Sequence, residues 1–129
     1  MERQYVKVAS AWGELIGYSR AVRAGNLICV SGTTATGEDG KAMHVGDVAA
    51  QARVILDRIM KALSELGAGA EHVVETIVYL VDMETWQEVG RVHGEYFSHV
   101  RPANTIIQVG PLIVPALMVE ISVRAWLDK

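Results

Sequence analysis

Residues 47–67, DVAAQARVILDRIMKALSELG, decide the fold of this chain. Apolar residues recur there at the three- and four-residue spacing of an amphipathic helix. Asp47 is a typical N-cap and Gly67 a typical terminator, so the helix is expected to lie between them. The expected core positions are Ala52, Ile55, Leu56, Ile59, Leu63 and Leu66, and the expected polar face is Gln51, Arg53, Asp57, Arg58, Lys61 and Glu65.

Strand-like segments lie on both sides of this helix. A second helix is expected at 84–98, with Trp86, Val89, His93, Tyr96 and Phe97 on one stripe. The expected strands are 5–9, 21–24, 27–31, 74–81, 105–109 and 117–126, with connections at 11–19 and 32–46. This order predicts an α+β fold in a single domain, 1–129, with two helices packed on one face of a mixed sheet.

Composition excludes several classes of protein. The chain has 129 residues, of which 50% are hydrophobic and 21% charged, so it is not a disordered chain. Its longest apolar run, 112–119, is too short to span a membrane and contains Pro115. The formal net charge is -3 without a basic block, which argues against nucleic-acid binding. The high apolar fraction favours a homo-oligomer.

Cysteine usage and the N-terminal residues bear on location. Cys29 is the single cysteine, so an intrachain disulfide or a cysteine zinc site is not expected, and no metal site is predicted. The N-terminal residues lack the apolar core of a signal peptide, and a cytoplasmic location is therefore expected.

The common catalytic motifs are missing from the sequence. It contains no phosphate-binding glycine loop, nucleophile elbow or Cys/His pair at ligand spacing. We expect His93 to be a packed or hydrogen-bonded core residue, and Cys29 to be a small buried hydrophobe. The three other histidines, expected at the surface, are His44, His72 and His99.

Glu120 is the most informative single residue. Strand alternation places Val119 and Ile121 on one face of the last strand and Glu120, with Met118, on the other. A carboxylate on a half-buried strand face needs a partner or a function. Glu120 is thus a candidate catalytic residue, although a solvated strand face would also explain it.

Several segments, in their order and spacing, resemble the YjgF/RidA family. The resemblance runs from about residue 18 to residue 124, nearly the whole chain. The segments that carry it are GYSRAV at 17–22, GNLICVSG at 25–32, QAR at 51–53, 73–81 followed by DM, PA at 102–103 and VEI at 119–121.

The resemblance implies a chorismate-mutase-like fold. It also implies a homotrimer with its sheets facing inward and a ligand cleft between subunits. The activity implied is hydrolysis of reactive imines and enamines to 2-keto acids and ammonia, without a cofactor. In that mechanism a glutamate matching Glu120 orients the attacking water, and Tyr18, Ser31 and Gly32 match positions that line the cleft.

The chain departs from the family pattern at Asn104. An arginine that grips the substrate carboxylate is expected there, and asparagine carries no charge and cannot make the same two-pronged contact. Arg20 or Arg101 could compensate, and either could equally be a surface charge. Trp12 and Trp86 could line a more aromatic cleft, with helix packing the simpler explanation for Trp86.

Three functions remain open from the sequence. In an imine or enamine hydrolase acting on a small metabolite, Glu120 orients water, while Asn104 and the backbone near Gly32 and Ile106 bind the polar end of the substrate. A trimer that binds a metabolite without chemistry would use the same cleft. An endoribonuclease is less consistent with the acidic charge balance.

Overall fold

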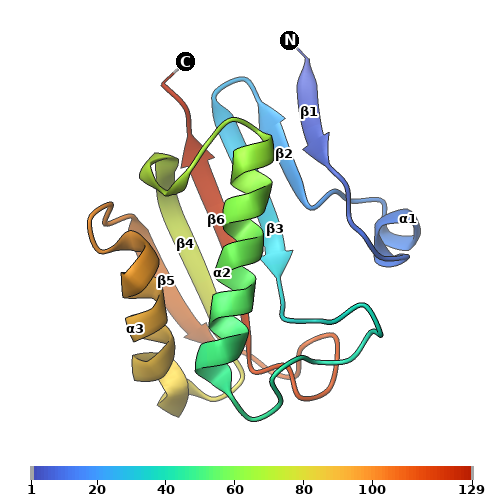
Figure 1. The fold of residues 1–129 in the computed structure, drawn as a ribbon, viewed down its shortest axis with the longest axis vertical. Coiled ribbons are helices and arrows are strands. Elements are labelled where there is room, and N and C mark those ends of the chain that lie inside the picture. Colours follow the sequence, from blue (N-terminus) through green and yellow to red (C-terminus); the bar gives the residue numbers. More distant parts are fainter. Residues whose placement is uncertain (1, 129) are drawn as a thin grey trace.

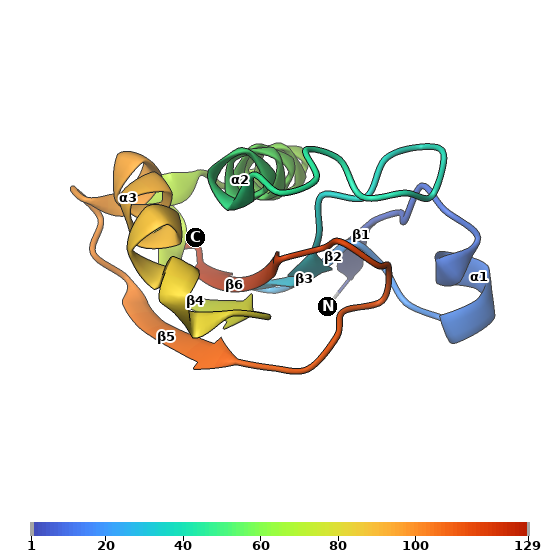
Figure 2. The same cartoon turned by 90° about the horizontal axis from the view of Figure 1, so that it is seen from below.

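Two helices lie on one face of a six-stranded sheet in the computed structural model of the chain, which describes residues 2–128 (Figures 1 and 2). The sheet order is β1-β2-β3-β6-β4-β5, and its paired strands are antiparallel except for β4 and β5. The α+β fold predicted from the sequence is therefore confirmed. The strands are β1 (Arg3–Val6), β2 (Ala21–Ala24), β3 (Leu27–Thr33), β4 (Val73–Leu80), β5 (Ala103–Gln108) and β6 (Val119–Trp126). The helices are α1 (Trp12–Ile16), α2 (Val48–Glu65) and α3 (Trp86–Phe97), with short 3-10 helices η1 (Ala70–His72) and η2 (Met83–Thr85).

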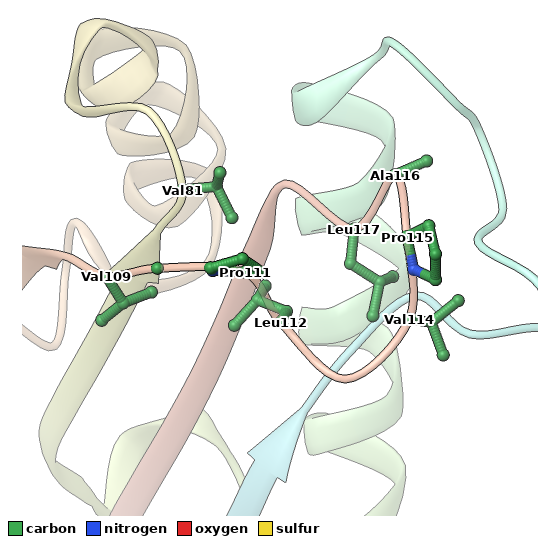
Figure 3. Close-up of a pocket in the computed structure, with 9 residues that line it drawn as sticks. Val81, Val109, Pro111, Leu112, Val114, Pro115, Ala116 and Leu117 are labelled. Carbon is green, nitrogen blue, oxygen red and sulfur yellow. The ribbon is translucent and has the colours of Figure 1, made fainter.

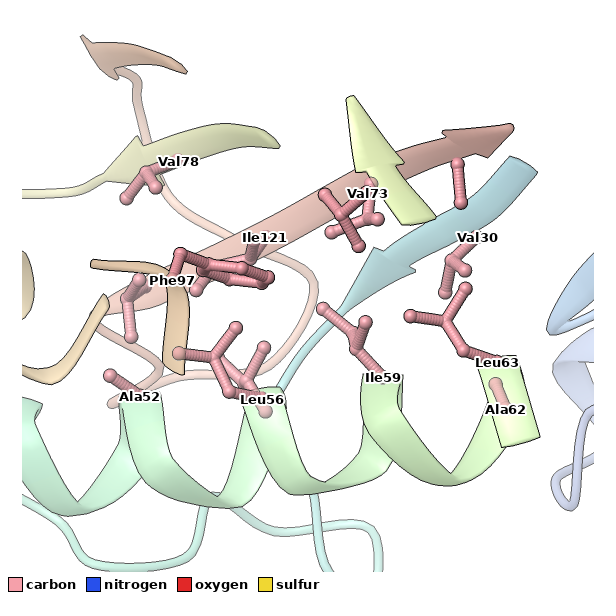
Figure 4. Packing of buried hydrophobic residues seen from close by; sticks show 14 of the residues in the cluster. Val30, Ala52, Leu56, Ile59, Ala62, Leu63, Val73, Val78, Phe97 and Ile121 are labelled. Atoms are coloured by element: carbon pink, nitrogen blue, oxygen red, sulfur yellow. The ribbon is translucent and has the colours of Figure 1, made fainter. Parts of the chain in front are cut away.

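Helix α2 begins and ends where its sequence predicts. The Asp47 side chain accepts a hydrogen bond from the Ala50 N–H. At the other end Gly67 takes a positive φ of 85°, a conformation that glycine adopts without strain. The apolar stripe of α2 packs on the sheet and on Phe97 of α3 (Figure 4). The six expected core positions, Ala52, Ile55, Leu56, Ile59, Leu63 and Leu66, are all buried.

Gln51 does not lie on the polar face of α2, which corrects the prediction from periodicity. It is fully buried, at 0% exposure. Its Nε2 donates to the carbonyls of Met43 and Ala116, at 3.1 and 3.0 Å, and its Oε1 accepts from the Met118 N–H at 2.8 Å. Two loops that fold over the start of α2 supply these partners, so the burial depends on tertiary structure.

Helix α3 buries a narrower stripe than expected. Val89, Val92 and Phe97 are buried, whereas Trp86, the first residue of the helix, is 48% exposed. His93 is half-buried. Its Nε2 lies at hydrogen-bond distance, 2.8 Å, from Thr76 Oγ1, and the centres of its ring and the Phe97 ring are 4.7 Å apart. The prediction of a packed, hydrogen-bonded histidine is confirmed. Burial lowers the pKa of His93 below its usual value.

Within residues 2–128, neither α2 nor α3 covers the other face of the sheet (Figure 2). Cys29 is exposed on that face, so the prediction that it is buried was wrong. It alternates with buried Ile28 and Val30, which point toward the helices, and it therefore points the opposite way. Leu27 and Trp126, which pair across β3 and β6, are also exposed, at 39% and 50%. The uncovered face is thus partly apolar.

Smaller differences from the expected elements lie at the edges of the fold. The connection expected at 11–19 contains α1, and the first strand covers Arg3–Val6 instead of 5–9. The last strand begins at Val119 instead of residue 117. Of the helices in the described part of the chain, none is both long and apolar enough to cross a membrane.

Candidate functional site

A cavity of about 300 Å³ lies where the end of β3 meets the start of β6. Its walls come from α1, the segment that follows α1, the end of β3, the loop before β6, and β6 itself. Five of the residues proposed from the sequence line it: Tyr18, Arg20, Ser31, Gly32 and Glu120. Trp12, Thr34 and Ile113 complete the lining.

A β-bulge brings the backbone of β3 to this cavity. Val30 pairs with Val123 and Thr33 pairs with Ile121, so Ser31 and Gly32 together oppose Ser122 alone. Two residues against one is the pattern of a bulge, which bends the strand and redirects its side chains. The bulge places Ser31 and Gly32 beside Glu120, which precedes Ile121 on β6.

Gly32 permits a close approach of the Glu120 side chain. A Cβ atom at position 32 would lie 1.9 Å from Oε2 of Glu120 and 2.9 Å from its carboxyl carbon. Both distances are far below a van der Waals contact. The carboxylate of Glu120 therefore occupies the space that any side chain at position 32 would need.

Glu120 is half-buried in this setting. Its neighbours Val119 and Ile121 are fully buried on the helix-covered face, and Glu120 points to the opposite face, as strand alternation predicts. Burial raises the pKa of Glu120 above its ordinary value, and the positive charge of Arg20 partly offsets that rise.

Arg20 is held beside Glu120 by the backbone of the bulge. Its Nη2 donates to the Gly32 carbonyl at 2.5 Å, and its guanidinium carbon lies 6.0 Å from the centre of the Tyr18 ring. Burial lowers the pKa of Arg20, while the nearby Tyr18 and Glu120 act in the opposite direction. Arginine nevertheless keeps its proton in proteins, so the group is a cation here.

Ser31 lines the cavity but its hydroxyl is engaged. Its Oγ donates to the Ser19 carbonyl at 2.7 Å, and its N–H donates to the Arg20 carbonyl at 2.9 Å. These bonds tie the segment that carries Tyr18 and Arg20 to β3. Ser31 therefore holds the two walls of the cavity together.

The other three residues proposed from the sequence do not line this cavity. Trp86 begins α3, whereas Asn104 and Ile106 lie on β5, beyond β4 from β6. Asn104 pairs with Thr76, and its Nδ2 donates to Thr76 Oγ1 at 2.9 Å. Thr76 also bonds His93, so the Asn104 amide points toward the helix-covered side. Arg101, at a positive φ of 59°, is exposed and likewise lies outside the cavity lining.

Sequence reasoning missed Thr34 and Ile113 as lining residues. Thr34 follows the bulge, so a bulge predicted at Ser31 and Gly32 would have drawn attention to it. Ile113 lies in the loop before β6, 57% exposed, and no sequence pattern distinguishes it from its apolar neighbours. Trp12, which could line an aromatic cleft by its place in the sequence, lies in the cavity wall.

A second pocket, of about 290 Å³, lies under the loop that precedes β6 (Figure 3). Its lining is aliphatic and contains none of the residues proposed as a site. It is formed by Val81, Val109, Gly110, Pro111, Leu112, Val114, Pro115, Ala116 and Leu117. The lining lacks ionisable side chains, so the first cavity is the better candidate for chemistry.

The chain is therefore a small α+β protein in which the carboxylate of a strand residue, Glu120, lies against a glycine in a β-bulge, Gly32. Comparisons with known proteins identify the family. The sequence model of the family described as Endoribonuclease L-PSP matches residues 9–127. The chain belongs to this family, which is also called YjgF/RidA.

Relatives and solved structures agree with that membership. The chain is 36% identical over 108 residues to the 3-aminoacrylate deaminase RutC of Acinetobacter baylyi, covering 84% of this chain and 85% of RutC. It is also 36% identical over 121 residues to a protein of Streptomyces coelicolor, covering 94% of this chain and 90% of that protein. A YjgF/YER057c/UK114 family structure from Mycobacterium tuberculosis superimposes with a TM-score of 0.88 at 41% identity, covering 98% of this chain and all of the other.

Proposed function

We propose that this protein hydrolyses reactive imines or enamines of small metabolites and releases ammonia. The observation that carries the proposal is the half-buried Glu120 carboxylate, which lies against Gly32 in the cavity and faces the same space as Arg20. The similarity to RutC, a 3-aminoacrylate deaminase, supports the same class of reaction. The finer assignments below go beyond that class.

Hydrolysis of an imine needs few catalytic groups from the protein. An enamine first takes up a proton on carbon to give the iminium ion, the protonated form of the imine, whose C=N carbon is electrophilic. Water adds to that carbon and loses a proton, which gives a carbinolamine whose nitrogen then accepts a proton. The C–N bond breaks with its electron pair going to nitrogen while the hydroxyl loses its proton, and the products are a carbonyl compound and ammonia. Glu120 would orient the water and accept its proton, so water and side chains are the reagents, without a cofactor.

We further propose that a second copy of the chain completes the site. Glu120, Gly32, Ser31, Tyr18 and Arg20 belong to the cavity of one chain, whereas the remaining candidates lie on β5 and at the start of α3. The uncovered, partly apolar sheet face is a surface on which copies could associate. In a homotrimer, as the family resemblance implies, the neighbour would contribute Trp86 and the part of β5 that carries Asn104 and Ile106 to the cleft.

The test is an assay of imine hydrolysis with matched variants. Imino acids are generated in the assay by an amino-acid oxidase, and the rate at which they disappear is compared for wild type, Glu120→Gln and Asn104→Arg. We expect turnover by wild type that is lost in Glu120→Gln, while Lys61→Gln, an exposed change on α2, leaves it unaltered. Absence of turnover by wild type and by Asn104→Arg would contradict the proposal.

A binding protein without catalysis is the second candidate. The observation that favours it is the engagement of the neutral Asn104 with Thr76, since this leaves the family's arginine position without a charge. Saturable ligand binding with thermal stabilisation but without turnover would support it. An endoribonuclease, although the family description names one, fits the net charge of -3 less well. The cytoplasmic location remains a prediction.

A further inference from the structure

We propose that Arg20 binds the anionic group of the ligand in this cavity and thereby selects anionic over neutral ligands. For a reacting substrate this assignment rests on the proposed function. For binding alone it rests on the cavity. Arg20 would then act as the specificity-determining residue of this chain, at a position distinct from Asn104.

The cavity holds one positive and one negative side chain with room for a ligand between them. Arg20 supplies the positive charge of the lining and Glu120 the negative charge. Within residues 2–128, the ion pairs closer than 4 Å are Arg53–Glu95, His72–Glu71 and Arg124–Glu75. Arg20 and Glu120 thus share the cavity without closing on each other. A ligand can place an anion at one and its reacting carbon at the other.

Arg20 is also held in place before any ligand arrives. Its bond to the Gly32 carbonyl and its position over Tyr18 fix the guanidinium. Its Nε is the buried side-chain polar atom, among the described residues, that has no hydrogen-bond partner. That buried nitrogen is closed to a ligand, which would instead meet the terminal nitrogens of the guanidinium. A guanidinium whose geometry is already fixed loses little conformational freedom when it binds a carboxylate.

A second cation strengthens the positive potential on the same side. Arg58 of α2 donates through Nη1 to the carbonyl of Thr34, a residue that lines the cavity. The positive charge of Arg58 is close enough to Arg20 to lower the pKa of Arg20. Arg58 itself is outside the lining. The repulsion between two neighbouring guanidinium groups is relieved when an anion binds.

The lining also indicates the shape of the ligand. Trp12, Tyr18 and Ile113 present aromatic and aliphatic surface, and a volume of about 300 Å³ is at the small end for ligand sites. A small carboxylate with an apolar or aromatic substituent matches these walls. Phenylacetate and its uncharged counterpart phenylacetamide therefore form a matched pair of probes.

The experiment measures binding of both probes by isothermal titration calorimetry. We expect wild type to prefer phenylacetate, and Arg20→Gln to weaken phenylacetate binding by about 10- to 100-fold with little change for phenylacetamide. Arg20→Lys should keep part of the preference because it keeps the charge. Glu120→Gln should strengthen phenylacetate binding, since a neighbouring negative charge is removed. Arg53→Gln, on the outer surface of α2, serves as the control.

A general disruption of the site would weaken both probes equally in Arg20→Gln, and that result would overturn the proposal. Failure of wild type to bind phenylacetate, or equal affinity for the two probes, would overturn it as well. Because neither probe is an imine, these outcomes are independent of whether the protein is a hydrolase. If wild type prefers phenylacetate but does not turn over any imine, that result would count against the proposed function alone.

Discussion

The contact between Gly32 and Glu120 makes position 32 sensitive to a single methyl group. In Gly32→Ala the added Cβ would lie 1.9 Å from Oε2, so the carboxylate must move. If Glu120 orients the water, a displacement of about 1 Å should lower kcat/KM by about 10²-fold. The measurement is imine hydrolysis beside the control Gly94→Ala, a helical position with open space around its Cβ. Unchanged kcat/KM in Gly32→Ala would contradict a catalytic role for the Glu120 position.

The pH dependence of turnover should report the Glu120 carboxylate. Burial raises its pKa above the ordinary value of 4.5, so it stays protonated in a pH range where a free glutamate is ionised. Activity that needs the carboxylate therefore rises with pH through that raised pKa. Because Arg20 lowers the Glu120 pKa, Arg20→Gln should move the acid limb of kcat/KM to higher pH, whereas Arg20→Lys should move it less. An acid limb at the same pH in all three proteins would contradict this assignment.

At the scale of elements, Gln51 connects α2 to two loops. Gln51→Leu keeps a buried side chain of similar size but removes the bonds to Met43, Ala116 and Met118. Loss of these bonds, with their backbone partners left unpaired, should lower the free energy of unfolding by about 2–4 kcal/mol. Urea denaturation measures it. Arg53→Leu, which breaks an exposed ion pair, should cost at most about 1 kcal/mol, and equal losses would contradict the argument.

His93 of α3, which bonds Thr76 of β4, should make the free energy of unfolding depend on pH. Burial lowers the pKa of His93 in the folded protein below the 6.5 of an unfolded chain. Between those two values the unfolded chain binds more protons, so stability rises with pH and levels off above about 6.5. His93→Gln should flatten this part of the curve of unfolding free energy against pH. A curve with the same slope in both proteins would show that other groups cause it.

The sequence could predict the elements better than their contacts. The caps and stripe of α2 are local properties, so Asp47, Gly67 and the apolar positions were placed correctly. Gln51 was misplaced because its burial depends on how two loops fold over α2, one of them far away in sequence, and the bulge at Gly32 left no local signal. Glu120 was placed by strand alternation, and Tyr18, Ser31 and Gly32 were placed through the family resemblance. The position of Asn104 against Thr76, in contrast, depends on the pairing of β4 with β5.

For the whole molecule, the two faces of the sheet differ in what covers them. The covered face forms the core with α2 and α3 (Figure 4). The uncovered face carries Cys29, Leu27 and Trp126 on its central strands, with Glu120 at the start of β6. Apolar side chains exposed together form the kind of surface through which copies of the chain would associate in the proposed homotrimer. The cavity lies at one end of this face, so association and ligand binding should be coupled.

That coupling gives a prediction for the assembled protein. Wild type should have a mass in solution of three times the 14.0 kDa of one chain, measured by light scattering after size-exclusion chromatography. Cys29→Lys places a second cation opposite Arg124 in the uncovered face and should lower that mass. It should also reduce turnover, because the neighbour would no longer supply the part of β5 that carries Asn104 and Ile106.

The control for this prediction is Lys61→Glu, a charge change of similar size on the outer face of α2. Because that face lies opposite the proposed interface, both mass and turnover should remain those of wild type. A wild-type monomer at every concentration tested would contradict the trimer. A Cys29→Lys protein that dissociates but keeps full turnover would show instead that one chain holds the complete site, because no residue from a neighbour would then be needed.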